Sequence, residues 1–327
     1  MGIVNQIISI LKEISFGRYH FQIGMLLRTT MLINGILYNT EALFNLSTKH
    51  TDMLEDCDKF FMRKLFEAEQ GTPIESFFLE TSAWPIRYII IGRKLMYYWK
   101  ILRKSERELV KKVFNAQSAF PTKGDWVTGI KDILKEYDIS FSEQEIGKMS
   151  ITKFKSIIKG KIQLKVMSHL IALQNKHTKS EQLHFDGKMQ EYLTASNLTL
   201  SDKKFVFTLR SKMLRIKGNF SSIYKGNMTC SLCLDKQFEE NENHLLACPE
   251  IIKLLGKEIE NVKYENVFKD LAKQKKAVII FRQIMNIYEK NRKTDTPGAS
   301  QHLQMPRMLI VLYDMDLNTS RCCRSHL

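Results

Sequence analysis

Three cysteines and one histidine stand close together in the sequence and have the chemistry of a metal site. Cys230 and Cys233 are separated by two residues, and His244 and Cys248 follow as a second pair, four positions apart. The first pair flanks a tight turn that can direct both thiolates at one point, and residues at i and i+4 share one face of a helix. We therefore expect a small CCHC zinc knuckle. Because four protein ligands leave no position for water, the Zn²⁺ ion is expected to be structural and not catalytic.

A disulfide between Cys230 and Cys233 is the competing interpretation of the same residues. The segment from Gly2 to Leu11 lacks the charged start and the cleavage site of a signal peptide. The sequence therefore favours an intracellular, reducing location, without distinguishing nucleus from cytoplasm. No apolar run has the length needed to cross a bilayer, so we expect a soluble chain with no membrane partner.

The charge of the chain indicates an acidic partner. The formal net charge is +15 over 327 residues, and the excess is concentrated: between Ile151 and Lys217 fourteen lysines and arginines stand against four acidic residues. A second basic block, from Arg87 to Lys112, is interleaved with tyrosines and a tryptophan. Phosphate neutralisation combined with aromatic stacking is typical of RNA or DNA binding, although the same lysines could be solvated helix faces and the same aromatics could be core. The candidate nucleic-acid contacts are Arg87, Arg93, Lys94, Lys161, Lys165, Arg210, Lys212, Arg215 and Lys217.

Apolar residues recur at steps of three and four along most of the chain, which predicts a mainly α fold. Glycine and proline are few, and they fall where one helical pattern stops and the next starts. We expect a helical bundle, the small zinc knuckle and a final helix. The predicted units are a helical region over 1–120, a basic helical connector over 121–218, the knuckle over 219–255, a C-terminal helix over 256–294 and a disordered tail over 295–327.

Several stretches carry a resemblance to a known family. These are RTTMLINGILYNTEALFNLS, LEDCDKFFMRKLF, FFLETSAWPIRYIIIGRKLMYYWKIL, KGDWV and LRSKMLRIKGNF, followed by the C-x2-C-x10-HLLAC pattern. In this order they resemble the carboxy-terminal half of reverse transcriptases of non-LTR, LINE-type retrotransposons. The resemblance covers roughly Phe16 to Tyr288 and implies a thumb, a helical connector and a zinc knuckle that hold template RNA or target DNA. It also implies other retrotransposon proteins as candidate partners.

The sequence departs from that family at the catalytic centre. Reverse transcriptases use aspartates of a Tyr-x-Asp-Asp turn to hold two metal ions, and this sequence contains no adjacent pair of aspartates. The Walker, dinucleotide-binding and hydrolase motifs are missing as well. We therefore expect a non-catalytic fragment, not an enzyme. The alternatives are a zinc-stabilised helical interaction module, or an inactive transposon relic that does not bind nucleic acid.

Overall fold

The computed structural model describes residues 2–14, 16–43, 47–176, 179, 181–220, 223–224, 228–235, 237–256, 259 and 262–294. The described chain is mainly helical, which confirms the predicted fold class. The helices are α1 (Gly2–Glu13), α2 (His20–Leu27), α3 (Asn34–Ile36), α4 (Thr48–Phe66), α5 (Ile74–Thr81), α6 (Ile86–Leu102), α7 (Leu109–Ala119), α8 (Trp126–Glu136), α9 (Glu143–Lys148), α10 (Ile151–Gln174), α11 (Glu191–Thr194), α12 (Leu200–Arg210), α13 (Glu242–Ala247), α14 (Pro249–Leu255) and α15 (Leu271–Thr294). Shorter turns are the 3₁₀ segments η1 (Gly17–Tyr19), η4 (Lys217–Phe220) and η6 (Tyr264–Asn266), and the π-helical η2 (Arg28–Ile33).

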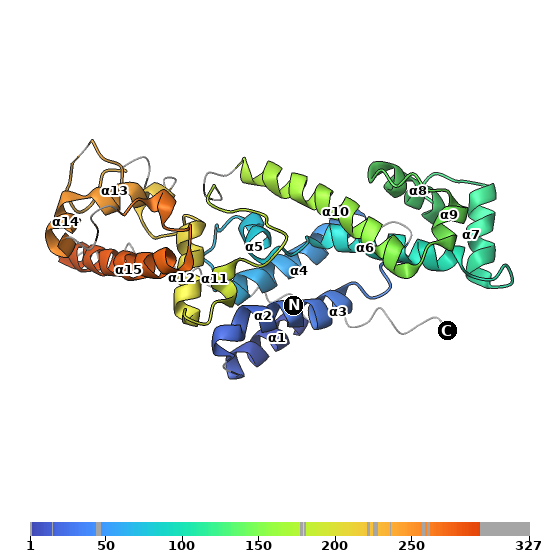
Figure 1. Cartoon of the computed structure of the whole chain (residues 1–327), viewed down its shortest axis with the longest axis horizontal. Helices are drawn as coiled ribbons and strands as arrows, with labels where there is room; N and C mark the ends of the chain where they lie inside the picture. The colour runs from blue at the N-terminus through green and yellow to red at the C-terminus, as the bar shows by residue number, and fades with distance from the viewer. Residues whose placement is uncertain are drawn as a thin grey trace, which may run out of the picture.

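The helices form an elongated molecule (Figure 1). α7, α8 and α9 lie at one end, α1 to α6 and α10 fill the middle, and α13, α14 and α15 lie at the other end. In the described part of the chain, extended pairing is limited to one antiparallel bridge between Thr229 and Glu239. The predicted tail, 295–327, lies outside the described residues.

Local sequence explains where many helices begin. The side chain of Ser150 accepts a hydrogen bond from the backbone N–H of Lys153 and so caps α10. Ser142 and Thr199 form capping boxes with the acidic residue three positions on, at the starts of α9 and α12. These short-range hydrogen bonds satisfy backbone donors that the first helical turn leaves free.

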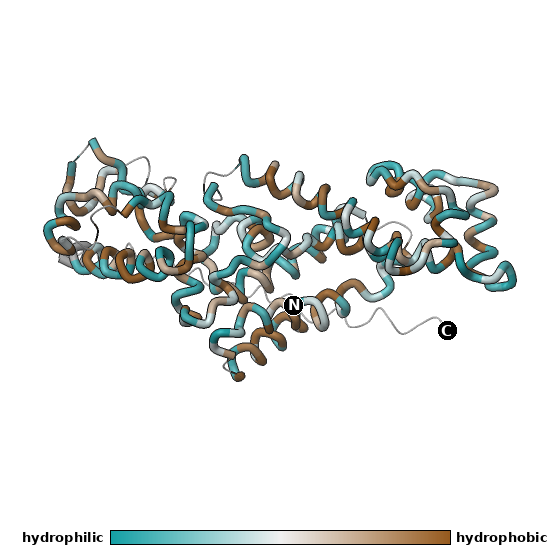
Figure 2. Tube along the Cα trace, viewed as in Figure 1, coloured by the Kyte–Doolittle hydropathy of each residue, from teal (hydrophilic) through white to brown (hydrophobic). Residues whose placement is uncertain are grey.

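The first and larger core lies between α1, α4, α5, α6, α8, α10 and α12. α10 packs along α6 and buries an apolar residue at every fourth position, from Phe154 through Ile158 to Leu170. The hydropathy-coloured trace (Figure 2) shows apolar and polar residues alternating along α10 and α15. In a helix, apolar residues at this period form a stripe along one face, and burial of that stripe holds the amphipathic helix against its neighbours.

The helical stretch from His20 to Ile36 is not one continuous α-helix. The π-helical η2 separates α2 from α3, and its Arg28 is buried against Asp58 of α4. Arg28 Nε and Nη2 each donate to an Asp58 carboxylate oxygen at 2.6 Å. The π-helical segment therefore occurs where the charged side chain of Arg28 is directed into the core.

The second core joins the predicted knuckle to the last helix. Leu209 and Ile216, the buried ligand cysteines, Ile251 and the apolar face of α15 belong to one cluster. Phe281 and Ile284 of α15 lie in this cluster, whereas Val278 of the same helix belongs to the first core. α15 therefore touches both cores.

The structure groups the predicted ranges differently from the sequence. Residues on both sides of the expected boundary at 120 share the first core, and both knuckle boundaries, at 218 and 255, fall inside the second. The physical reason is that the knuckle has too few apolar residues to bury a core alone, so it uses α15 to cover its ligands.

Candidate metal centre and basic surface

The four predicted ligands converge. Their ligand atoms lie within 4.8 Å of one another. Cys230 Sγ is 4.0 Å from Cys248 Sγ, and Cys233 Sγ is 3.4 Å from His244 Nε2. A tetrahedral ion with bonds of about 2.3 Å to sulfur and 2.0 Å to nitrogen needs edges of roughly 3.8 and 3.5 Å. The cluster therefore has the donor set and the size of a closed tetrahedral metal site.

The elements that position the ligands differ slightly from those predicted. His244 lies in α13, as expected, but Cys248 follows the last residue of that helix, with extended backbone angles, and serves as the N-cap of α14. Pro249 at the first position of α14 ends α13 and starts the next helix. The histidine and cysteine thus reach the site from a helix-to-helix junction and not from one helical face.

Burial controls the chemistry of the cysteines. It raises the pKa of the Cys230 thiol to about 12, and it also raises the pKa of Cys248. Backbone N–H groups of Leu232 and Cys233 act in the opposite direction at Cys230, since they favour its thiolate. A metal ion must therefore displace protons from these thiols, and its charge compensates for their burial.

A buried carboxylate ties the ligand turn to the last helix. The side chain of Glu240 is fully buried. Its Oε1 accepts hydrogen bonds from the backbone N–H of Lys217 and the hydroxyl of Tyr288, both at 2.8 Å, and its Oε2 accepts one from the N–H of Ser231 at 2.7 Å. Ser231 lies between the first two cysteines, so Glu240 links that turn to η4 and α15.

The chain around His244 is fixed by its neighbours. Asn241 Oδ1 caps α13 by accepting from the His244 N–H at 2.9 Å, and the Phe238 ring stacks on the imidazole at a centroid distance of 5.0 Å. Gly218 N–H donates to the carbonyl of Glu240 at 2.8 Å, and a Cβ at Gly218 would lie only 2.5 Å from that oxygen. Only glycine allows this close approach of η4 to the ligand segment.

Arg210, predicted as a nucleic-acid contact, is not accessible. It is 3% exposed, and its Nε donates to Glu80 Oε1 at 2.6 Å. Burial acts to lower the pKa of Arg210, but the charge and the hydrogen bond of Glu80, together with the nearby Tyr192 and Tyr264, outweigh it and the net pKa is raised. The prediction for Arg210 is therefore corrected: its charge is used inside the protein, where it joins α12 to α5.

The basic residues that follow Arg210 are engaged by the protein itself. Lys212 Nζ lies 2.8 Å from Glu181 Oε2, and Arg215 Nε donates to Glu69 Oε1 at 3.0 Å. Lys217 Nζ donates to the carbonyl of Thr229 at 2.8 Å. Arg215 remains largely exposed, so its pairing is weak, whereas Lys217 is a structural contact of the knuckle.

In the second basic block, Arg87 and Arg93 are also partnered. Arg87 forms a two-point contact with Glu55 at 2.6 and 2.7 Å, and Arg93 Nη1 donates to the Leu37 carbonyl at 2.8 Å. Lys94 is half-buried, and burial lowers its pKa. The two arginines join α6 to α4 and to the segment after α3.

The aromatic residues of this block serve mainly as core. Tyr98 is 2% exposed, and Trp99 Nε1 donates to the carbonyl of Met149 at 3.1 Å. Tyr97 packs edge-on against Trp126. Tyr98 is thus not available as a stacking platform for bases, and Tyr97 and Trp99 are half-buried.

The remaining predicted contacts, Lys161 and Lys165, lie on α10. Lys165 is exposed and Lys161 is half-buried. α10 also carries Lys153, Lys155 and Lys159, all exposed, and its sequence has no acidic residue. The described residues provide no ion-pair partner for any of these five lysines, in contrast to Arg87, Lys212 and Arg215.

Comparisons with protein-family models, curated proteins and solved structures found no match. Among the described helices, none combines the length and the apolar composition needed to cross a membrane.

Sequence reasoning missed the residues that support the metal centre. Glu240, Tyr288 and Gly218 carry no motif, and Tyr288 lies 48 residues from its Glu240 partner. One signal was present for Glu240. It lies in sequence between the two ligand pairs, and in the structure it accepts a hydrogen bond from the N–H of Ser231 in the ligand turn.

Proposed function

We propose that this chain is a non-catalytic nucleic-acid-binding module, derived from the carboxy-terminal part of a non-LTR retrotransposon reverse transcriptase. In this proposal α10 holds the phosphate backbone of RNA or DNA, and a structural Zn²⁺ ion organises the second core. The resemblance supports the origin, and the contacts of the described residues support the binding surface.

The main observation that supports this proposal is the unneutralised positive charge of α10. Five lysines lie on a helix of 24 residues without a carboxylate of its own and without an ion pair in the described structure. At a rise of about 1.5 Å per residue the helix is about 36 Å long, and the phosphates of one strand are spaced about 3.4 Å along the axis of a duplex. Lys155 and Lys159 lie one helical turn apart, as do Lys161 and Lys165. Within each pair, this spacing lets both ammonium groups reach phosphates of one backbone.

Zinc is the metal that the ligand set favours. Three thiolates and one imidazole in a tetrahedral arrangement are typical of structural zinc sites, whereas calcium and magnesium take oxygen ligands. Two of the sulfur ligands, Cys230 and Cys248, are fully buried in the second core. The ion would therefore be shielded from water and would stabilise the fold without reacting.

The experiment compares two matched double variants of the full chain. Lys155→Gln/Lys159→Gln removes two charges from α10, and Lys131→Gln/Lys135→Gln removes two charges at the same spacing from exposed positions of α8. Binding of a labelled structured RNA and a matched duplex DNA is measured by fluorescence anisotropy over a salt series.

We expect the α10 variant to weaken binding and to reduce the slope of log K against log salt by about 0.7 to 0.9 for each phosphate that its lysines no longer neutralise. The α8 variant should change neither the binding affinity nor the salt slope by more than about twofold. Equal effects in the two variants would show that only net charge matters, and unchanged binding in the α10 variant would refute the proposed surface.

A second candidate function is favoured by the outer face of the same helix. Leu164, Met167 and Ile171 are 62%, 40% and 40% exposed and recur at helical spacing. An apolar stripe of this kind fits a helical protein partner or a second copy of the chain. Sedimentation of the protein with and without Leu164→Gln tests self-association. If α10 neither binds nucleic acid nor associates, the inactive relic is the better description.

A further inference from the structure

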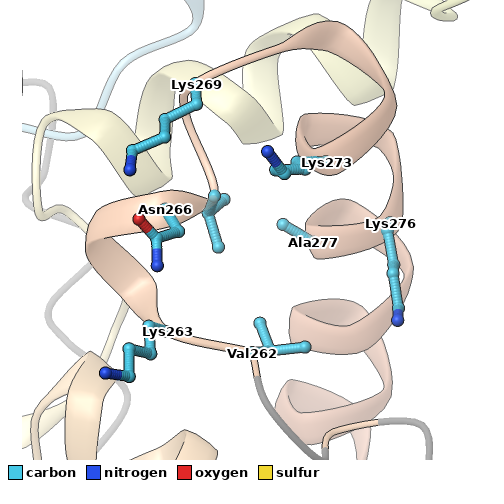
Figure 3. Close-up of a pocket in the computed structure, with 8 residues that line it drawn as sticks. Val262, Lys263, Asn266, Lys269, Lys273, Lys276 and Ala277 are labelled. Carbon is cyan, nitrogen blue, oxygen red and sulfur yellow. The ribbon is translucent and has the colours of Figure 1, made fainter.

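A basic hollow lies in the second core, away from α10. It has a volume of about 380 Å³ and lies between the segment around η6 and the first turns of α15 (Figure 3). Its floor is apolar and includes Val267 and Ala277, which are 2% and 1% exposed. Its lining contains four lysines and one amide: Lys263, Lys269, Lys273, Lys276 and Asn266.

The charge around this hollow is mostly uncompensated. Three of the four lysines have no ion pair among the described residues, and the lining residues include no carboxylate. The exception is Lys273, which pairs with Asp270 Oδ2 at 2.8 Å. Figure 3 shows Lys269 and Lys273 on opposite walls at the same end of the opening, with the Asn266 side chain further along the wall that carries Lys269.

Lysine side chains at the rim of a hollow can bind a phosphate group. Each ammonium is a compact cation with three donors that can turn toward the oxygens of a phosphate. All four lysines are exposed, so solvent screens the repulsion between them, and an anion that enters the hollow adds favourable charge pairing. The volume lies within the range of about 300–1,000 Å³ that is usual for ligand sites, so it admits a phosphate together with the group that carries it.

We propose that this hollow is a phosphate-binding site, taking either a backbone phosphate of nucleic acid or a free polyphosphate. Lys269, Lys273 and Asn266 would hold the oxygens, and Lys263 and Lys276 would attract the anion from outside. The inference does not depend on α10, because the two surfaces share no residue. It does depend on the metal centre, since Val267 and Ala277 pack in the same core as Cys230 and Cys248.

The test uses the full chain loaded with zinc and two probes, inorganic tripolyphosphate and a short single-stranded oligonucleotide. Isothermal titration calorimetry at low salt gives the affinity of each probe for the unmodified chain, for Lys269→Gln/Lys273→Gln and for the α8 control Lys131→Gln/Lys135→Gln. Circular dichroism establishes that each variant is folded. The α10 variant Lys155→Gln/Lys159→Gln is measured beside them, so that an effect at one surface can be distinguished from an effect at the other.

We expect at least one probe to bind and Lys269→Gln/Lys273→Gln to weaken it by about tenfold or more, because charge-assisted hydrogen bonds to the phosphate are removed. The α8 control should stay within about twofold. Binding of tripolyphosphate identifies a free polyphosphate as a ligand, and binding of the oligonucleotide alone identifies the backbone. If neither probe binds, or if the hollow variant and the α8 control weaken binding equally, the proposal is wrong, whatever the result for α10.

Discussion

The support of the metal centre by Glu240 gives the sharpest test of the structure. In Glu240→Gln the oxygen of the new amide can still accept from Lys217 and Tyr288, but its Nε2–H group then faces the Ser231 N–H. If the amide turns over, the N–H of Lys217 is opposed in the same way. One of the two backbone donors is therefore left without its acceptor in either orientation.

The size of the effect follows from these hydrogen bonds. A hydrogen bond to a charged group contributes about 1.5–3 kcal/mol, and leaving a buried donor unsatisfied costs about 1–3 kcal/mol. We expect Glu240→Gln to destabilise the second core by about 3 kcal/mol, roughly a hundredfold in an equilibrium constant. Because metal binding and folding of this unit are linked, the destabilisation should appear as weaker zinc binding.

The assay is a zinc titration against a competing chelator, together with urea unfolding of the zinc-loaded chain. Glu239→Gln is the matched control, because it makes the same charge change at the adjacent, exposed position. The control should bind zinc like the unmodified chain. If Glu240→Gln binds zinc within about threefold of Glu239→Gln and unfolds at the same urea concentration, the assigned role of the buried carboxylate is wrong.

Three further perturbations test other parts of the structure. Cys248→Ser, or removal of zinc by a chelator, should unfold α13 to α15, while the amides of the first core keep their protection in hydrogen exchange. A uniform decrease in protection along the chain would contradict the division into two separately stable cores. Glu80→Gln leaves Arg210 buried without its counter-charge and should lower the free energy of unfolding by about 3–5 kcal/mol in urea, whereas a decrease below about 1 kcal/mol would mean that the pair is not buried in solution. Burial lowers the pKa of His20 below its ordinary 6.5, so the unfolded state takes up protons first and stability should fall as the pH drops below about 6.5. The unfolding free energy at pH 7.5 and 5.5 should differ less in His20→Asn than in the unmodified chain, and His184→Asn, at an exposed position, should keep the full difference.

The helices and the ligand cluster could be predicted because both depend on local sequence. The four ligands lie within one short segment, and spacing alone indicates that they share a site. The start of α10 follows from a serine cap, and its buried face follows from a four-residue repeat. In these places the nearest neighbours in sequence are also the residues that decide the conformation.

The roles of the basic residues could not be predicted, because they depend on partners far away in the chain. Arg210 and Glu80 are 130 residues apart, and Arg215 and Glu69 are 146 apart. A count of charges along the sequence treats a buried ion pair and a solvated lysine alike. The structure separates them, and it shifts the candidate surface from the segment around Arg210 to α10 and to the hollow beside α15.

The position of α15 sets an order of events during synthesis of the chain. Cys230 to Cys248 leave the ribosome before Phe281 and Ile284, the residues that complete the core beneath them. A nascent chain that has reached only residue 256 can gather its ligands, but it cannot yet shield them from water or from competing thiols. An ion bound by these ligands would become slow to exchange only when the last helix docks, so its retention would report that the whole second core has formed.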